Sequence, residues 1–308
     1  MNKRLIVGEA KKLPEVNSQH EFGGQHTELK LWVVENYLKA FTKALKRHFP
    51  ELWYFDAFAG TGLRTVRYEA SIADLLDAAV PERIEQRRGS ARIAIEVTPQ
   101  FDTLVFIEAK PLHCEALHGL ARQHRDRNIR IVEGDANQAI QAEMGRCRWE
   151  RTRAVMFLDP YGMDVEWATL KAVAATKAID VWYLFPLSGL YRQATRSSRD
   201  IDPSKRNAIT RLLGTSDWEQ ELYTESKQAD FFGGQEKERT ADVKGLERYV
   251  QNRLGTIFNK VLDPLALPIE RKPQRYSLFF CISNPEPKAT DLATRIARHT
   301  ILRAGSSS

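Results

Sequence analysis

The chain has 308 residues, of which 43% are apolar and 28% are charged, and its formal net charge at pH 7 is +6. This size and composition can supply the core of one large α/β domain with insertions, and the modest positive charge permits a polyanionic partner without requiring one. No apolar run approaches the roughly 18 residues of a membrane span, and the N-terminus turns polar too early for a secretory signal. We therefore expect a cytoplasmic protein with no membrane partner.

The three cysteines are isolated from one another along the chain. Cys114, Cys147 and Cys281 form no Cys-x-x-Cys pair, which is a spacing typical of zinc and redox sites. We therefore predict buried or free thiols in a reducing compartment, and no metal site.

The N-terminal part is predicted to hold an irregular segment, residues 1–25, and one long amphipathic helix. The helix begins at Thr27, whose hydroxyl is suited to cap it, and Pro50 ends it. From residue 26 to 304 we expect a single domain, followed by a flexible tail at 305–308. Apolar residues recur along the helix at steps of three and four, which predicts one buried face made of Leu29, Trp32, Val33, Tyr37, Phe41, Leu45 and Phe49.

Apolar runs that alternate with helical segments are typical of the strands of a parallel sheet. They cover residues 52–56, 103–108, 129–135, 154–158 and 179–186. Their alternation with helices predicts an α/β fold with an open, doubly wound, mostly parallel Rossmann-like sheet. Two later segments, 265–269 and 276–283, are suited to an antiparallel pair that adds an antiparallel edge strand, and a terminal helix follows at about 288–303.

Two segments interrupt this alternation and are predicted to be insertions. Residues 63–88 are charged and stand where the first crossover helix would begin, so we predict a lid before the helix restarts at Gly89-Ser90. Residues 191–262 are polar and largely helical, with a last helix at about 243–262. The start of this second segment is basic and could grip nucleic-acid phosphates, with a tyrosine as a stacking surface. The candidate residues are Tyr191, Arg192, Arg196, Arg199, Lys205 and Arg206.

The stretch 52–62 carries the clearest chemical signal. An apolar strand ends at Asp56, and the following Ala-Phe-Ala-Gly-Thr-Gly lets the backbone pass close to a ligand. A Walker phosphate loop would need a lysine where Leu63 stands, and the dinucleotide fingerprint would need a third glycine where Thr65 stands, which disfavours ATP and NAD. Asp56 would repel a phosphate, but it could receive an ammonium group.

Acidic residues also follow the other predicted strands. Right-handed crossovers put the carboxyl ends of parallel strands on one rim, so Asp56, Glu108, Asp135 and Asp159 should converge. Glu108 is suited to accept hydrogen bonds from ribose hydroxyls and Asp135 from an adenine amino group, with the Ala136 amide near the ring. An amino acid, a ribose and an adenine together describe S-adenosylmethionine. The candidate cofactor-binding residues are Asp56, Phe58, Gly60, Thr61, Gly62, Glu108, Asp135 and Ala136.

Several motifs of this chain resemble those of a known family. Residues 56–62 resemble motif I of class I methyltransferases, and Asp159-Pro160-Tyr161-Gly162 resembles their fourth motif. The other matching motifs are His26-Thr27-x-x-Lys30, Gly89-Ser90, Gly134-Asp135-Ala136-Asn137 and Phe185-Pro186. In this order the set resembles the three-Cys-motif partner (TcmP) family over about residues 20–190. The resemblance implies a methyltransferase-like fold and a partner protein that bears three cysteines.

The fourth motif bears on the reaction. In methyltransferases that act on amino groups of nucleic-acid bases, it consists of Asp or Asn, two prolines and an aromatic residue. Its side-chain oxygen and a backbone carbonyl accept hydrogen bonds from the amine, while the aromatic ring stacks on the base. Asp159, Pro160 and Tyr161 are the candidate catalytic residues, although the second proline is missing and Tyr161 comes one position early. We expect a methyltransferase that acts on a base amine of DNA or RNA.

Other interpretations stay open. A catalytically altered protein with the same cofactor fold could serve as a partner or nucleic-acid-binding component beside a three-cysteine protein. An NAD-dependent oxidoreductase is a further alternative. If the protein is a methyltransferase, its methyl acceptor could also be a protein or a small molecule. Asp159 could belong to a simple turn, Glu108 to a solvated strand end, Asp135 to a helix cap and residues 192–211 to a solvated helical face. Trp182-Tyr183 is expected in the core.

Overall fold

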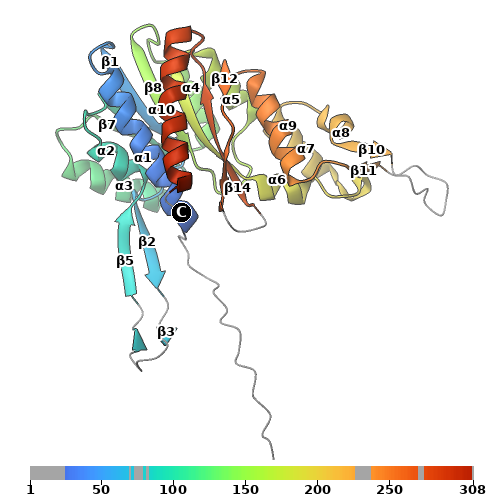
Figure 1. Ribbon diagram of the computed structural model, residues 1–308. Helices are drawn as coiled ribbons and strands as arrows, with labels where there is room; N and C mark the ends of the chain where they lie inside the picture. The colour runs from blue at the N-terminus through green and yellow to red at the C-terminus, as the bar shows by residue number, and fades with distance from the viewer. Residues whose placement is uncertain are drawn as a thin grey trace, which may run out of the picture.

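The computed structural model describes residues 25–68, 71–72, 79–80, 83–225, 237–269 and 274–306. Most of the predicted irregular segment 1–25 lies outside these ranges, as do the last two residues of the predicted tail and the side chain of His26. The fold class is the predicted one: a mostly parallel, Rossmann-like sheet carries helices on both faces (Figure 1).

The parallel part of the sheet is made of the predicted apolar runs. Its strands are β1 (Glu51–Asp56), β6 (Thr103–Glu108), β7 (Ile129–Glu133), β8 (Thr152–Leu158) and β9 (Ile179–Phe185). They lie in the order β7-β6-β1-β8-β9, and each pairs in parallel with its neighbours. β6, β8 and β9 are buried on both faces, which explains why their sequences are continuously apolar and do not alternate with polar residues.

The antiparallel side of the sheet comes from the C-terminal third. β14 (Tyr276–Ile282) pairs antiparallel with β9, as predicted, and the short strands β12 (Lys260–Val261) and β13 (Leu265–Leu267) pair with β14. The prediction of a helix over 243–262 is wrong at its C-terminal end, because α9 (Val243–Gly255) stops at Gly255. Residues 260–261 join the sheet instead, since the edge of β14 satisfies their backbone hydrogen bonds.

Helices cover the sheet in two layers. α1 (Gln25–Leu45), α2 (Ser90–Glu96), α3 (Pro111–Gln123) and α10 (Pro287–Ser306) pack on one face, and α4 (Ala136–Met144), α5 (Trp167–Ala175), α6 (Leu187–Gln193) and α9 pack on the other. Each layer has its own buried apolar cluster. Trp182 and Tyr183 are neighbours on β9 but belong to opposite clusters, because successive side chains of a strand point to opposite faces. Both are buried, as predicted.

A helical extension follows β9. It contains α6, a 3-10 turn (Ser198–Asp200), α7 (Pro203–Leu213), α8 (Trp218–Glu221) and the antiparallel pair β10 (Tyr223–Glu225) and β11 (Lys237–Arg239). Trp218 anchors this extension: its side chain is fully buried, and its indole nitrogen donates to the Thr210 hydroxyl at 3.1 Å.

Residues 63–88, for which a lid was predicted, contain an antiparallel ribbon. β2 (Leu63–Tyr68) pairs with β5 (Arg83–Arg88), and the short strands β3 (Ser71–Ile72) and β4 (Ala79–Val80) pair with each other. Figure 1 shows β2 and β5 projecting from the body of the domain, beside the end at which α1 begins. Whether the ribbon closes over a ligand stays a prediction.

The buried face of α1 differs from the predicted one. Trp32 was expected inside, but it is 37% exposed. Steps of three and four starting at Lys30 lead to Val34, Tyr37 and Phe41, all of which are buried, whereas Trp32 lies on the far side of this stripe. The prediction failed because Trp32 is apolar enough to be counted with either face.

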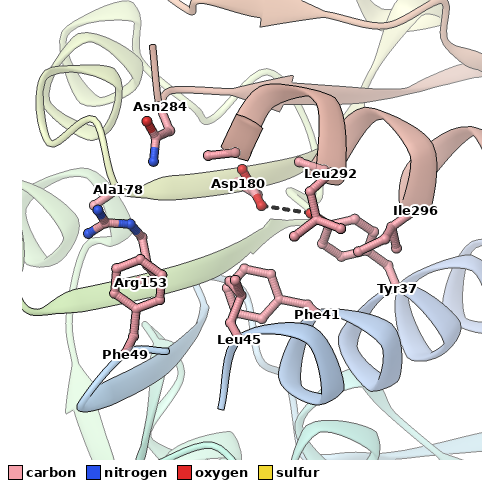
Figure 2. A pocket seen from close by; sticks show the side chains of 12 residues that line it. Tyr37, Phe41, Leu45, Phe49, Arg153, Ala178, Asp180, Asn284, Leu292 and Ile296 are labelled. Carbon is pink, nitrogen blue, oxygen red and sulfur yellow. Dashed lines mark hydrogen bonds between the residues drawn. The ribbon is translucent and has the colours of Figure 1, made fainter. Parts of the chain in front are cut away.

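A crevice of about 50 Å³ lies between α1, α10 and the start of β9 (Figure 2). At its floor, Asp180 Oδ2 accepts a hydrogen bond from the Tyr37 hydroxyl at 2.6 Å. Most of its lining is apolar, and its polar groups are Tyr37, Arg153, Asp180 and Asn284. Burial raises the pKa of Asp180 to about 7, although the Tyr37 hydroxyl and Arg153 lower it.

Asp180 should make the protein less stable as the pH rises. Because its pKa increases from 3.8 in the unfolded chain to about 7 in the fold, its contribution to the free energy of unfolding falls between pH 4 and 7 and stays low above that range. Asp180→Asn, which keeps an oxygen for Tyr37, should raise the free energy of unfolding at pH 8 by up to about 4 kcal/mol and change it little at pH 4. Calorimetric unfolding at both pH values measures this.

Tyr37→Phe is the matched control for this prediction. Loss of the donor makes the ionised Asp180 more costly, so Tyr37→Phe should lose more stability at pH 8 than at pH 4. Equal effects of Asp180→Asn at both pH values would contradict the assignment.

Candidate functional site

The chain leaves β1 and crosses the carboxyl ends of both neighbouring strands. The Ala57 amide donates to the Phe157 carbonyl of β8 at 3.2 Å, and the Ala59 amide donates to the Ile107 carbonyl of β6 at 3.1 Å. Loop 57–62 is therefore tied to both strands where the strand order reverses, since β6 lies on one side of β1 and β8 on the other. In open α/β sheets, ligands bind at this place.

The two glycines of the loop are required by its backbone. Gly60 and Gly62 have φ values of 59° and 75°, in the left-handed region that favours glycine. A Cβ atom on Gly62 would lie 2.7 Å from Leu120 Cδ2 of α3, and the Gly89 amide donates to the Gly62 carbonyl at 2.9 Å. This close approach closes the base of the ribbon, so that α2 restarts at Ser90, where the sequence predicted it.

Glu108 organises the loop from the end of β6. Its Oε2 accepts a hydrogen bond from the Gly60 amide at 2.9 Å, and its Oε1 accepts from the Ala109 and Lys110 amides, each at 3.0 Å. The residue is buried, so it is not the solvated strand end that the sequence left open. Because an ionised carboxylate has about four acceptor positions, Glu108 can still accept from a ligand hydroxyl.

A cavity of about 180 Å³ opens beside Glu108. The loop after β1, the end of β6, the start of α4 and the segment after β8 form its walls. Of the predicted cofactor residues, Phe58, Glu108, Asp135 and Ala136 line it. Tyr161, predicted as catalytic, lines it as well, and the remaining lining residues are Ala57, Ala109, Lys110, Gly134, Asn137 and Asp164. Gly60, Thr61 and Gly62 shape the loop without lining this cavity; the Thr61 hydroxyl donates to the Leu63 carbonyl at 2.6 Å.

Asp135 is a helix cap at the border of the cavity. Its Oδ1 accepts from the Gln138 amide at 3.0 Å, in the first turn of α4. The helix-cap interpretation is thus confirmed, and contact with an adenine stays a prediction. Asn137, two residues after Asp135, holds α4 in place. Its side-chain oxygen accepts hydrogen bonds from the Glu166 amide and the Thr169 hydroxyl, both at 2.9 Å.

Asp56 lies beneath the loop and is 0% exposed. The Tyr54 hydroxyl donates to its Oδ2 at 3.4 Å, whereas its buried Oδ1 has no hydrogen-bond partner within the described residues. Burial raises the pKa of Asp56 to about 7, and the charge of Asp159 raises it further. The Ser90 hydroxyl and the Phe58 amide, which lie near the carboxyl group, lower this pKa. Asp56 is therefore a buried acid with one unsatisfied oxygen.

Asp159, two residues beyond the loop's contact with β8, forms an ion pair with α1. Lys30 Nζ lies 2.5 Å from Asp159 Oδ2, and Lys30 is only 9% exposed. A buried ammonium group needs such a partner, because leaving it unpaired would cost several kcal/mol. Lys30 thus brings a positive charge to a region that holds the carboxylates of Asp56 and Asp159.

Tyr161 stands at the mouth of the cavity and is 68% exposed. Lys110 Nζ lies 4.5 Å from the centroid of its ring, so the two side chains bridge the ends of β6 and β8 by a cation–π contact. Pro160 is buried beside it. The stacking of Tyr161 on a base stays a prediction.

Two cations of the site, Lys30 and Lys110, were absent from the predicted site residues. For Lys30 a signal was available: it occupies the apolar stripe of α1, four residues before Val34 and seven before Tyr37, and a lysine on a buried face needs a partner. For Lys110 no comparable signal exists, because a lysine that follows a strand is usually solvated.

The predicted nucleic-acid-binding residues lie on the helical extension, on the far side of β8 from the cavity. Arg196 contacts Glu238 at 3.5 Å, Lys205 contacts Asp202 at 3.6 Å, and Arg206 contacts Glu219 at 2.7 Å. The exposed ring of Tyr191 is covered by the Arg239 guanidinium, 4.0 Å from its centroid. Arg192 and Arg199 are exposed. Acidic neighbours thus offset much of the positive charge of this basic stretch. Its contact with nucleic acid stays a prediction.

Comparisons with known proteins give low similarity. No family model and no curated protein matches the chain. Protein LPL1258 of Legionella pneumophila, described by the family model DUF519, is 11% identical with a TM-score of 0.48, over 88% of this chain and 91% of its own. An S-adenosylmethionine-dependent methyltransferase of Clostridium acetobutylicum is 9% identical with a TM-score of 0.35, over 82% of this chain and 91% of its own. Scores this low carry no argument about the activity of this chain.

The described residues contain neither a membrane-spanning helix nor a metal-binding cluster. None of their helices combines the length and the apolar character that crossing a bilayer requires. Likewise, no three His, Cys, Asp or Glu residues in the described ranges are grouped so that they could hold a metal ion.

Gly62→Ala should damage the loop more than Gly60→Ala. Both substitutions put a side chain on a left-handed residue, at about 1–2 kcal/mol each. Only the Cβ at position 62 also meets Leu120, whereas nothing lies within 4 Å of a Cβ at position 60. Denaturant unfolding should show a loss at least about 1 kcal/mol larger for Gly62→Ala. Equal losses of stability for the two variants would contradict this prediction, because they would mean that α3 moves away from the new Cβ atom at little cost.

Proposed function

We propose that this protein is an S-adenosylmethionine-dependent methyltransferase that acts on an exocyclic amine of a nucleic-acid base. The unsatisfied Oδ1 of Asp56 carries the proposal. Ionising a fully buried carboxyl group whose pKa has risen from 3.8 to about 7 costs on the order of 4 kcal/mol. A cationic group bound at loop 57–62 offsets this cost, whereas an anionic phosphate increases it.

The residues around the cavity fit the rest of such a cofactor. Glu108, held by backbone amides, keeps acceptor capacity for ribose hydroxyls, and Phe58 and Ala136 supply apolar walls beside Asp135. Nothing lies within 4 Å of a Cβ placed on Gly60 or on Gly134, so the backbone there is open to a ligand. When bound, the cofactor supplies an electrophilic methyl group on its sulfonium.

The residues after β8 are suited to hold the acceptor amine. The Asp159 carboxylate and the Pro160 carbonyl can accept its hydrogens, which directs the nitrogen lone pair toward the methyl group. Lys30 holds Oδ2 of Asp159, so Oδ1 is the oxygen that would accept from the amine.

The Lys30–Asp159 ion pair also favours a second candidate function. A carboxylate that is already held by a lysine could serve only to close the site, in which case the protein binds the cofactor without methyl transfer. It would then act as the nucleic-acid-binding or partner component of a system that includes a three-cysteine protein, as the resemblance implies. Cofactor binding without turnover on any nucleic-acid pool would favour this candidate.

Cofactor affinity should depend on the ionisation of Asp56. Because a cationic group binds the carboxylate and not the carboxylic acid, the Kd for S-adenosylmethionine should rise as the pH falls below 7, by up to about tenfold per pH unit. Asp56→Asn should weaken binding at least about tenfold at pH 8 and remove this pH dependence. Isothermal titration calorimetry between pH 6 and 8.5 measures both.

Asp180→Asn is the matched control for this titration. Asp180 is also an acid whose pKa burial raises to about 7, but it lies at the opposite end of the sheet, where β9 begins. Its substitution should leave both the Kd and its pH dependence unchanged. A wild-type protein that binds neither S-adenosylmethionine nor S-adenosylhomocysteine would end the proposal.

Loss of the Asp159 side chain should impair methyl transfer much more than it impairs cofactor binding. With labelled S-adenosylmethionine and separate DNA, RNA and protein pools, wild-type protein should label a nucleic-acid pool. Asp159→Ala is made together with Lys30→Met, so that no buried ammonium group is left unpaired; compared with Lys30→Met alone, the double variant should reduce labelling by at least about 100-fold, because the amine loses its acceptor, while the cofactor Kd changes less than about threefold. Lys30→Met should lower labelling by a smaller factor. Labelling that survives in the double variant would assign the acceptor site elsewhere.

A further inference from the structure

The crevice between α1, α10 and the start of β9 combines apolar walls with a polar floor (Figure 2). Its volume of about 50 Å³ leaves room for a group of several heavy atoms, since one water molecule needs about 10–15 Å³. The crevice lies at the opposite end of the sheet from loop 57–62, so a ligand there would be separate from the proposed cofactor. The apolar walls come from the two helices and include Phe41, Leu45, Leu292 and Ile296.

Three polar side chains of the crevice keep hydrogen-bonding capacity. Asp180 Oδ2 accepts from the Tyr37 hydroxyl, and within the described part of the chain no donor contacts its Oδ1. Arg153 Nη1 donates to two main-chain carbonyls, each at 2.8 Å, whereas its buried Nε has no partner among the described residues. Asn284 Oδ1 accepts from a main-chain amide at 2.9 Å, and the described residues provide no acceptor for its side-chain nitrogen. Figure 2 shows Arg153 and Asn284 on the same side of Asp180.

Arg153 and Asp180 carry opposite charges but form no ion pair, because Arg153 is engaged with main-chain carbonyls. Burial lowers the pKa of Arg153 and raises that of Asp180, and the charge of each residue partly reverses the shift of the other. The crevice thus holds one acid and one base that remain apart. A charged ligand would meet a like charge there, since Arg153 repels an ammonium group and Asp180 repels a carboxylate.

We propose that the crevice binds a small molecule through a primary carboxamide, with a short alkyl group between α1 and α10. A carboxamide carries N–H donors and a carbonyl oxygen with two acceptor positions. One N–H can donate to Asp180 Oδ1, while the carbonyl accepts from Arg153 and Asn284, so the ligand uses all three groups that keep capacity. Because the carboxamide is neutral, neither charge of the crevice repels it. This site goes beyond the proposed function and does not depend on it.

Three ligands of one shape test the choice of head group. They are isobutyramide, isobutyrate and isobutylamine. At pH 8, where Asp180 is mostly ionised, isobutyramide should bind wild-type protein with a Kd on the order of 1 mM, and the two charged ligands should bind at least about tenfold more weakly. Ligand-observed NMR titrations measure the three Kd values. Absence of isobutyramide binding, or equal binding of either charged ligand, would overturn the inference.

Asp180→Asn changes the charge of the crevice and should change its ligand preference. The substituted side chain still offers an oxygen to the carboxamide, but Arg153 no longer lies near a carboxylate. Isobutyrate should therefore gain at least about tenfold in affinity, while the Kd of isobutyramide changes less than about threefold. A gain in affinity cannot result from a poorly folded variant. If isobutyrate binds this variant no better than wild type, the assignment of the polar floor is wrong.

Ala289→Leu tests the location of the site. Ala289 lines the crevice in the first turn of α10 and is half-buried, so a larger side chain there should fill the crevice and raise the Kd of isobutyramide at least about tenfold. Asp291→Leu, at an exposed position of the same helix, is the matched control and should bind isobutyramide as wild type does. Wild-type affinity in Ala289→Leu, or an equal loss in both variants, would place the bound ligand outside the crevice and overturn the inference.

Discussion

The convergence of carboxylates at the ends of parallel strands is the constraint on which the site depends. Parallel strands put Asp56 and Asp159 on neighbouring positions of one edge, where burial and mutual repulsion raise the pKa of Asp56 to about 7. Lys30 offsets part of this repulsion through its ion pair with Asp159. The remaining cost is a local destabilisation of the ligand-free protein, of the kind that proteins retain where a ligand will bind.

α1 makes polar contacts with three separate parts of the molecule: the ribbon, the segment after β8 and the start of β9. Within about three turns it contributes Glu28 to the ribbon, Lys30 to Asp159 and Tyr37 to Asp180. Its apolar stripe anchors it to the sheet, so these polar contacts are held on a rigid element. A helix packed in this way can keep the ribbon and the proposed acceptor site in one fixed relation, which a flexible lid could not do.

Much of the site was predictable because its residues follow strands. Glu108 and Asp135 were expected at one rim from their positions after apolar runs, and both border the cavity. Their hydrogen-bond partners were harder to predict from the sequence. Glu108 is held by three backbone amides, and Asp135 caps α4. The basic stretch 192–211 shows the opposite case, since the partners of Arg196 and Arg206 lie 42 and 13 residues away along the chain. Charge in a sequence segment says nothing about the acids that folding brings beside it.

The sequence by itself determined the strands, the sheet class and the acidic residues at the strand ends, because apolar runs, glycines and turn residues act locally. Only the tertiary structure decided that Lys30 meets Asp159, that Oδ1 of Asp56 stays unsatisfied and that β2 and β5 form a ribbon tied to α1. Each of these depends on contacts between segments far apart in the chain; Lys30 and Asp159 are separated by 129 residues. Such pairings follow from how the layers pack, which no local pattern encodes.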